Sequence, residues 1–159
     1  MKKIIIFVFF IFLAMPCSAE KRFDIYKDAS LDASKILFEY ITKENTNEFL
    51  KIAKINQEAC LAFFYDLNAD GENEIIGTVF SSAYSGTAGY SLIILQKNKD
   101  NYKEISYLIN YYPQNGITIL NSCSLGYQDI SIWGNKQYDF PLMVKFNKEY
   151  QLYTYFFPN

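Results

Sequence analysis

The sequence predicts a single exported domain of mixed α and β structure. In the predicted α+β fold, a pair of N-terminal helices packs on one face of an antiparallel meander of about six to eight strands. Three observations predict this: an apolar run opens the chain, a helical period follows it, and from Cys60 onward the hydrophobic period changes to two. Short strand-like runs joined by short turns are typical of antiparallel sheets and not of βαβ units.

The start of the chain, residues 1–19, has the pattern of a secretory signal peptide. Lys2 and Lys3 precede an unbroken apolar run over residues 4–14, and Ala19 is a small residue at the expected cleavage position. The run is too short to span about 30 Å of hydrocarbon as a helix. We therefore expect a periplasmic or secreted protein without a membrane span after cleavage. A lipoprotein anchor on Cys17, or an uncleaved anchor, is the alternative.

Size and charge limit the function classes. Residues 20–28 are charged and are expected to form a loose lead-in, and residues 29–159 have the length of one domain. The chain carries 15 Lys and Arg against 17 Asp and Glu, without a basic stripe, so we expect no nucleic acid as a partner. It contains no His, which excludes His-dependent triads and the usual zinc sites.

Two helices are expected before the strands. Residues 30–44 carry one apolar stripe at helical spacing, formed by Ala33, Ile36, Leu37, Tyr40 and Ile41. Asn45, with Glu48 three residues further on, resembles a capping box. This predicts a second helix from about Thr46 to Ile55, which should bury Phe49, Ile52 and Ala53.

Two further features of the strand region suggest sites. Once the signal peptide is removed, Cys60 and Cys123 remain, and in an oxidising compartment we expect them to pair, with two buried thiols as the alternative. A Ser/Gly-rich loop, residues 81–91, joins two predicted strands. Binding residues concentrate on such loops, so a ligand would contact Tyr84, Ser85 and Tyr90. The alternative is a hairpin loop that binds nothing.

The sharpest chemical signal is DLNADGENEIIG, residues 66–77, between two predicted strands. Oxygen donors stand at alternate positions in this stretch: Asp66, Asn68, Asp70, Glu72 and Glu74. A calcium loop needs such donors together with a glycine at the sharp turn, here Gly71. An EF-hand would need a glutamate at its twelfth position, where Gly77 stands, and helical flanks, so this loop is not an EF-hand.

The stretch YDLNADGENEIIG resembles the calcium loop of FG-GAP and VCBS-type repeats, in which two antiparallel strands flank a DxNxDGxxE segment. The resemblance covers residues 63–80, in one copy, so it does not imply a complete propeller. It implies a Ca²⁺ held by the side chains of Asp66, Asn68, Asp70 and Glu74 and by the Glu72 carbonyl. No Lys or Arg occurs between Lys54 and Lys97 to neutralise these acids. The alternative is a solvated, Asx-rich turn without a metal.

These features lead us to expect a non-enzymatic binding or structural module of the cell envelope. Its partner would be an unknown protein or envelope ligand. One alternative is an inhibitor or immunity-type protein that docks on an envelope enzyme. Another is a small carboxylate-dependent hydrolase, for which Asp129 and Asp139 are the candidate pair.

Overall fold

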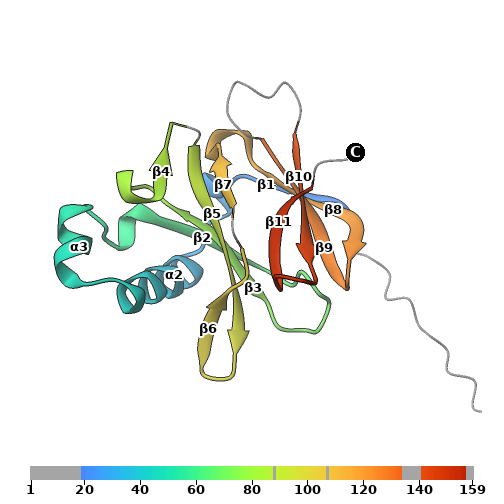
Figure 1. The fold of residues 1–159 in the computed structure, drawn as a ribbon, viewed down its shortest axis with the longest axis horizontal. Coiled ribbons are helices and arrows are strands. Elements are labelled where there is room, and N and C mark those ends of the chain that lie inside the picture. Colours follow the sequence, from blue (N-terminus) through green and yellow to red (C-terminus); the bar gives the residue numbers. More distant parts are fainter. Residues whose placement is uncertain (1–18, 88, 107, 134–140, 157–159) are drawn as a thin grey trace, which may run out of the picture.

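The computed structural model describes residues 19–87, 89–106, 108–133 and 141–156. Helices cover one face of a six-stranded sheet, and a five-stranded sheet covers its other face (Figure 1). The predicted mixture of helices and antiparallel sheets is confirmed. The strands differ from the prediction in forming two packed sheets instead of one meander. Residues 1–18 of the expected signal peptide lie outside the described residues.

The N-terminal part of the domain is built from a short strand and three helices. Residues 20–28, expected as a loose lead-in, contain β1 (Lys21–Phe23) and α1 (Ile25–Asp28). The main helix is α2 (Leu31–Glu44), and α3 (Asn47–Ile52) follows it. The start of α2 is fixed by Ser30, whose hydroxyl accepts a hydrogen bond from the Ala33 amide at 3.2 Å.

The second helix starts one residue later than the capping box predicted. Its N-cap is Thr46, whose hydroxyl accepts a hydrogen bond from the Phe49 amide at 3.2 Å. Asn45 instead closes the end of α2, because its side-chain amide donates to the Ile41 carbonyl at 2.9 Å and to the Tyr84 hydroxyl at 3.1 Å. An amide that satisfies the C-terminal carbonyls of one helix is not available to cap the next.

The face of α3 that is buried also differs from the prediction. Leu50 and Ala53 lie in the core, whereas Phe49 is 38% exposed and Ile52 is 75% exposed. The expected burial of Phe49 and Ile52 was therefore wrong, and only Ala53 of the predicted set is buried.

The six-stranded sheet follows the helices, and its order is β2-β3-β5-β4, with β6 and β7 also paired to β5. Its strands are β2 (Cys60–Tyr65), β3 (Glu74–Val79), β4 (Ser85–Gly86), β5 (Gly89–Asn98), β6 (Asn101–Glu104) and β7 (Leu108–Tyr111). Every pairing in it is antiparallel. Short 3₁₀ turns lie at Gln57–Ala59 before β2, at Ser82–Tyr84 between β3 and β4, and at Pro113–Asn115 after β7.

The five-stranded sheet has the order β1-β8-β9-β10-β11. It adds β8 (Ile117–Ser124), β9 (Tyr127–Ile132), β10 (Leu142–Asn147) and β11 (Leu152–Phe156) to β1. The short strand β1 places the first residues of the domain beside a strand from its C-terminal half, since Arg22 faces Thr118 in the ladder.

The six-stranded sheet is buried on both faces, which explains why a second sheet is needed. Toward the helices, Ile75 and Ile93 pack with Leu37 and Ile41 of α2. Toward the second sheet, the alternate residues belong to a separate core, which includes Phe63, Ile76, Leu92, Ile94, Ile119, Ile130 and Tyr153. Successive strand residues point to opposite faces, so apolar side chains at both odd and even positions of a strand have to be covered on both faces of the sheet.

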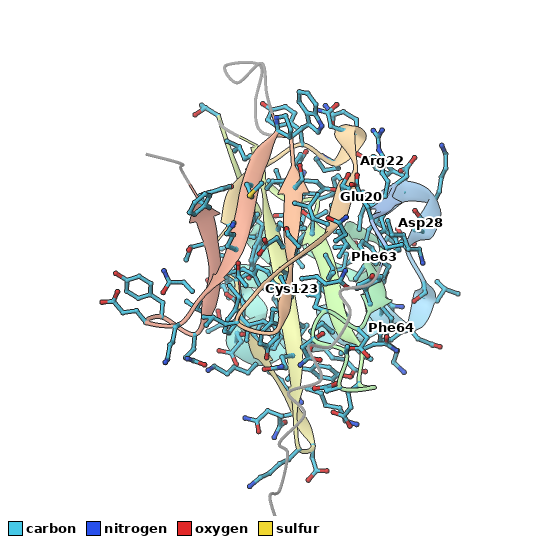
Figure 2. All side chains as sticks on the ribbon, turned by 90° about the vertical axis from the view of Figure 1, so that its right-hand side faces the viewer. Glu20, Arg22, Asp28, Phe63, Phe64 and Cys123 are labelled. Atoms are coloured by element: carbon cyan, nitrogen blue, oxygen red, sulfur yellow. The ribbon has the colours of Figure 1, made fainter. Side chains whose placement is uncertain are left out.

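The expected bond between Cys60 and Cys123 is not formed. Cys60 is a free thiol with 0% exposure in the core between α2 and the six-stranded sheet. Cys123 is disulfide-bonded, but it lies exposed on β8 of the other sheet, the sheet that faces the viewer in Figure 2. The two cysteines belong to different layers, and a disulfide requires Cα atoms within about 7 Å of each other.

Candidate metal centre

The acidic loop connects β2 to β3 and is folded by its own side chains. Asp66 accepts hydrogen bonds from the Gly71 amide (2.9 Å) and the Asp70 amide (3.2 Å). Asn68 Oδ1 also accepts from the Asp70 amide, and its Nδ2 donates to the Asp70 carboxylate at 2.8 Å. The Glu72 amide donates to Asp70 at 2.8 Å. These Asx turns fold the backbone around the side-chain oxygens of the predicted donors.

The sharp part of the loop has the backbone that the sequence predicted. Gly71 has a φ of 85°, and a Cβ added to it would meet nothing within 4 Å, so glycine is required there by conformation and not by space. Ala69 also has a positive φ, 57°. Two left-handed residues reverse the chain direction within the loop.

The last predicted donor, Glu74, is buried. It is the first residue of β3 and is 2% exposed. One of its carboxylate oxygens accepts a hydrogen bond from the Leu67 amide at 2.8 Å, and the other accepts from Gln96 Nε2 at 3.3 Å. The same Gln96 nitrogen donates to the Tyr127 hydroxyl, on the second sheet, at 2.6 Å. Glu74 thus connects the loop to both sheets.

The pKa of Glu74 is raised to about 7, mainly by burial and to a smaller extent by the nearby carboxylates of Asp70 and Asp66, while hydrogen bonds from Leu67 and Gln96 act in the opposite direction. Asp70 and Asp66 are therefore near enough for their charges to act on Glu74. A positive charge among them would favour the ionised form of Glu74.

Glu72 is oriented differently from the other acids. Its carboxylate pairs with Lys97 Nζ at 3.1 Å, and both side chains are about half exposed. The sequence places no base within the loop, but β5 brings Lys97 beside it. Lys97 relieves the charge of Glu72, and the carboxylates of Asp66, Asp70 and Glu74 have no such base among the described residues.

The types of donor in the loop fit a calcium ion. Within the described part of the chain, no group of three or more His, Cys, Asp or Glu side chains stands in an arrangement that could hold a metal. The predicted donor set is different, since it includes the Asn68 amide and the Glu72 carbonyl, and hard oxygen donors of this mixed kind are what Ca²⁺ takes. The carboxylates of Asp66, Asp70 and Glu74 each accept hydrogen bonds and retain further lone pairs.

The structure does not bring the three residues of the predicted ligand loop together. Ser85 faces Tyr90 in the β4–β5 ladder. Tyr84 packs against the core on the helix side, where Asn45 donates to its hydroxyl. Tyr90 instead contacts Phe80, with ring centroids 5.1 Å apart. The two tyrosines therefore make different contacts, and a ligand at this loop stays a prediction.

The carboxylate pair of the hydrolase hypothesis cannot be placed as a pair, because Asp139 lies outside the described residues. Asp129 is 1% exposed, accepts a hydrogen bond from the Ser122 hydroxyl at 2.7 Å, and lies 3.7 Å from Lys145 Nζ. A carboxylate this deeply covered does not face an open cleft.

Gln96 and Tyr127 were not predicted as site residues from the sequence. A signal for Gln96 exists in the pattern of β5, since it continues the alternation of Leu92 and Ile94, which point into the core between the sheets. A polar residue at a core position of a strand predicts a buried hydrogen-bonding partner. The identity of that partner, Glu74, depends on strand pairing and cannot be read from neighbouring residues in the sequence.

Comparisons with known proteins add no family. No protein-family model, no curated protein and no solved structure matches the chain. Within the residues that the structure describes, none of the helices combines the length and apolar character needed to cross a membrane.

Proposed function

We propose that the chain is an exported, non-enzymatic binding or structural module of the cell envelope, in which the acidic loop holds a structural Ca²⁺. The observation that carries this proposal is the buried carboxylate of Glu74, 2% exposed, beside Asp66 and Asp70. Burying a carboxylate is costly unless it is neutralised or paired. Within the described residues, no base is paired with Glu74.

The ion would be held by the side chains of Asp66, Asn68, Asp70 and Glu74 and by the Glu72 carbonyl. Bound there, Ca²⁺ supplies the positive charge that this cluster lacks. The chain's own residues orient the donors, since the loop amides hold Asp66 and Asp70 while the Leu67 amide and Gln96 hold Glu74.

The position of the loop indicates a bracing role. Leu67, the second residue of the loop, is 1% exposed, and its carbonyl accepts a hydrogen bond from the Gln128 amide of β9 at 2.7 Å. The loop is thus joined to the second sheet by Leu67 and by the bridge from Glu74 through Gln96 to Tyr127. An ion that rigidifies the loop would stabilise the contact between the sheets.

Export supports the same proposal. The pattern of residues 1–19 is that of a signal peptide, and calcium modules outside cells work with dissociation constants of about 0.1–1 mM. A loop with modest affinity would be filled in that setting. The alternative of an inhibitor that docks on an envelope enzyme stays a prediction.

Thermal unfolding tests the proposal. Calcium at about 100 times its dissociation constant stabilises a protein by about 2.7 kcal/mol, so the melting temperature should rise with calcium and fall with chelator. Asp66→Asn and Asp70→Asn should lose this response. The matched control is Glu149→Gln, an exposed acid in the turn between β10 and β11, which should keep it. The proposal fails if the unaltered protein melts at the same temperature with calcium and with chelator.

A further inference from the structure

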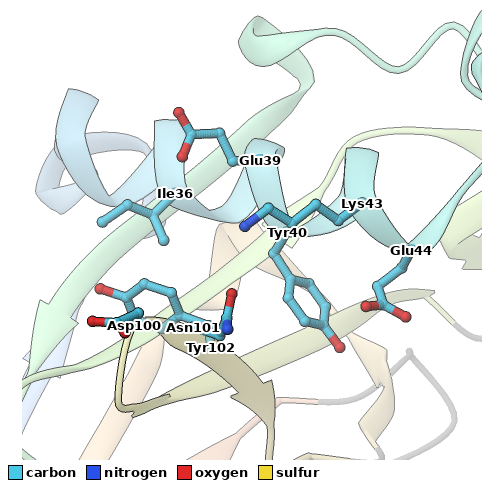
Figure 3. Close-up of a pocket in the computed structure, with 8 residues that line it drawn as sticks. All are labelled: Ile36, Glu39, Tyr40, Lys43, Glu44, Asp100, Asn101 and Tyr102. Atoms are coloured by element: carbon cyan, nitrogen blue, oxygen red, sulfur yellow. The ribbon is translucent and has the colours of Figure 1, made fainter.

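A second site is suggested by a cavity of about 250 Å³ between α2 and the β5–β6 hairpin (Figure 3). Ile36 and Tyr40 of α2 form part of one wall, and Tyr102 of β6 forms part of the other. The cavity lies on the helix side of the six-stranded sheet, away from the loop between β2 and β3. At this volume it suits a short chain and not a large ring system.

The charged residues around the cavity are mostly acidic. Glu39, Glu44 and Asp100 contribute three carboxylates, and Lys43 is the one base among the lining residues. Glu39 has a distant partner, Lys35, at 3.9 Å. Across the described chain, neither Glu44 nor Asp100 is in an ion pair.

Glu44 lies where the local electrostatic field disfavours its negative charge. It is the last residue of α2, and the C-terminal end of a helix carries partial negative charge that disfavours a carboxylate. Glu104 lies nearby and is half-buried, and its pKa is raised by burial and then by the charge of Glu44. Residues that oppose local stability without a compensating contact are expected at functional sites.

The walls suit a cation on an aliphatic stem. The faces of tyrosine rings attract ammonium groups, and an apolar side chain such as Ile36 packs against methylene groups. Burial raises the pKa of Tyr40, and the negative charges of Glu104 and Glu44 raise it further, so the negative potential extends to its hydroxyl. We propose that this cavity binds a primary ammonium group carried on an aliphatic chain.

Lys43 lines the cavity and would compete with an ammonium ligand. Its side chain reaches back over the cavity, and its amine lies between Glu39 above and Asp100 and Asn101 below in the view of Figure 3. This exposed amine carries the same charge as the proposed ligand and is in no ion pair within the described part of the chain. A ligand has to displace this amine, so removal of Lys43 should strengthen binding.

The test is a titration of the isotopically labelled protein with 1,5-diaminopentane, followed by amide chemical shifts. We expect shifts confined to residues 36–45 and 100–104. Loss of one charged hydrogen-bonding partner should weaken binding about tenfold in Glu44→Gln and in Asp100→Asn. Lys43→Met should strengthen it. Glu149→Gln and Lys51→Met, exposed residues outside the cavity, are the matched controls and should leave affinity unchanged.

Two peptides distinguish the source of the ammonium. One carries a single lysine between glycine and serine residues, and the other carries the same lysine acetylated. If the diamine binds and neither peptide does, the ligand is a small free amine. If the lysine peptide binds and its acetylated form does not, the ligand is a lysine side chain of another protein. Each result supports the proposal. It is overturned if neither amine shifts these residues, or if Glu44→Gln binds as tightly as the unaltered protein. Since Glu44 opposes the helix dipole, Gln at this position should not impair folding.

Discussion

Gln96 joins the buried carboxylate of Glu74 to the hydroxyl of Tyr127 on the opposite sheet. Its Nε2 lies 3.3 Å from Glu74 Oε1 and 2.6 Å from the Tyr127 oxygen. One side-chain amide therefore spans the interface between the sheets at the acidic loop. Replacing it with an apolar residue of similar length would remove the one side-chain donor that Glu74 Oε1 has within the described residues.

We expect Gln96→Leu to lower the free energy of unfolding by about 1–3 kcal/mol, because a buried polar group that loses its partner is not compensated by water. Urea denaturation in chelator measures this loss without a contribution from metal. The matched control is Gln57→Leu, since Gln57 is exposed in a 3₁₀ turn. Equal losses in the two variants would contradict a special role for Gln96.

Glu74 should make the metal-free protein less stable as pH rises. Its pKa is about 7 when folded, against an ordinary value of 4.5. Between these values the folded state binds more protons than the unfolded state, so the free energy of unfolding falls as pH rises through this window. The stabilisation is fully present below the lower value and is lost above the higher one.

Urea denaturation in chelator at several pH values tests this dependence. Glu74→Gln should flatten the fall in stability, since an amide does not titrate, and calcium should weaken it in the unaltered protein by favouring the charged carboxylate. Glu149→Gln, an exposed acid, should keep the original slope. If Glu74→Gln and the unaltered protein have the same slope, another group is responsible.

Gly77 should not tolerate a side chain. A Cβ at this position would lie 2.6 Å from both the Ala62 Cβ and the Leu61 carbonyl oxygen, and 2.8 Å from Leu37 Cδ2. Glycine therefore sets the close approach of α2 to β2 and β3. Gly77→Ala should cost about 1–3 kcal/mol through overpacking. Gly86→Ala is the matched control, because nothing lies within 4 Å of its Cβ position, and it should be nearly neutral in the same denaturation measurement.

The features that could be predicted from the sequence are the local ones. The helical stripe predicted α2, and the structure buries its Ala33, Leu37 and Ile41. The alternate donors and Gly71 predicted a folded loop between two strands, and the Asx turns of Asp66, Asn68 and Asp70 form within that segment. Such features depend on residues a few positions apart.

The features that were missed depend on partners distant in sequence. Asn45 satisfies the α2 carbonyl of Ile41 and the Tyr84 hydroxyl, and this displaces it from the predicted cap. The second sheet is needed because β3 and β5 carry apolar residues at both odd and even positions, and a sheet covered on one face cannot bury both sets. The cavity between α2 and the β5–β6 hairpin combines acids that lie far apart in the chain, such as Glu44 and Asp100.

Cys60 should be protected from thiol reagents in the folded protein. It has 0% exposure, and burial raises its pKa to about 12, so almost no thiolate forms at a pH of about 8. Labelling under native conditions should be slow and limited by opening of the core between α2 and the sheet, whereas labelling in urea should be fast. Mass spectrometry of the labelled peptide identifies the site.

Cys60→Ser should lower the free energy of unfolding by about 1–3 kcal/mol more than a replacement without a hydroxyl does, because the serine hydroxyl would lack a partner in this apolar core. Cys60→Ala is that comparison, and a Ser variant as stable as the Ala variant would show that water reaches the site.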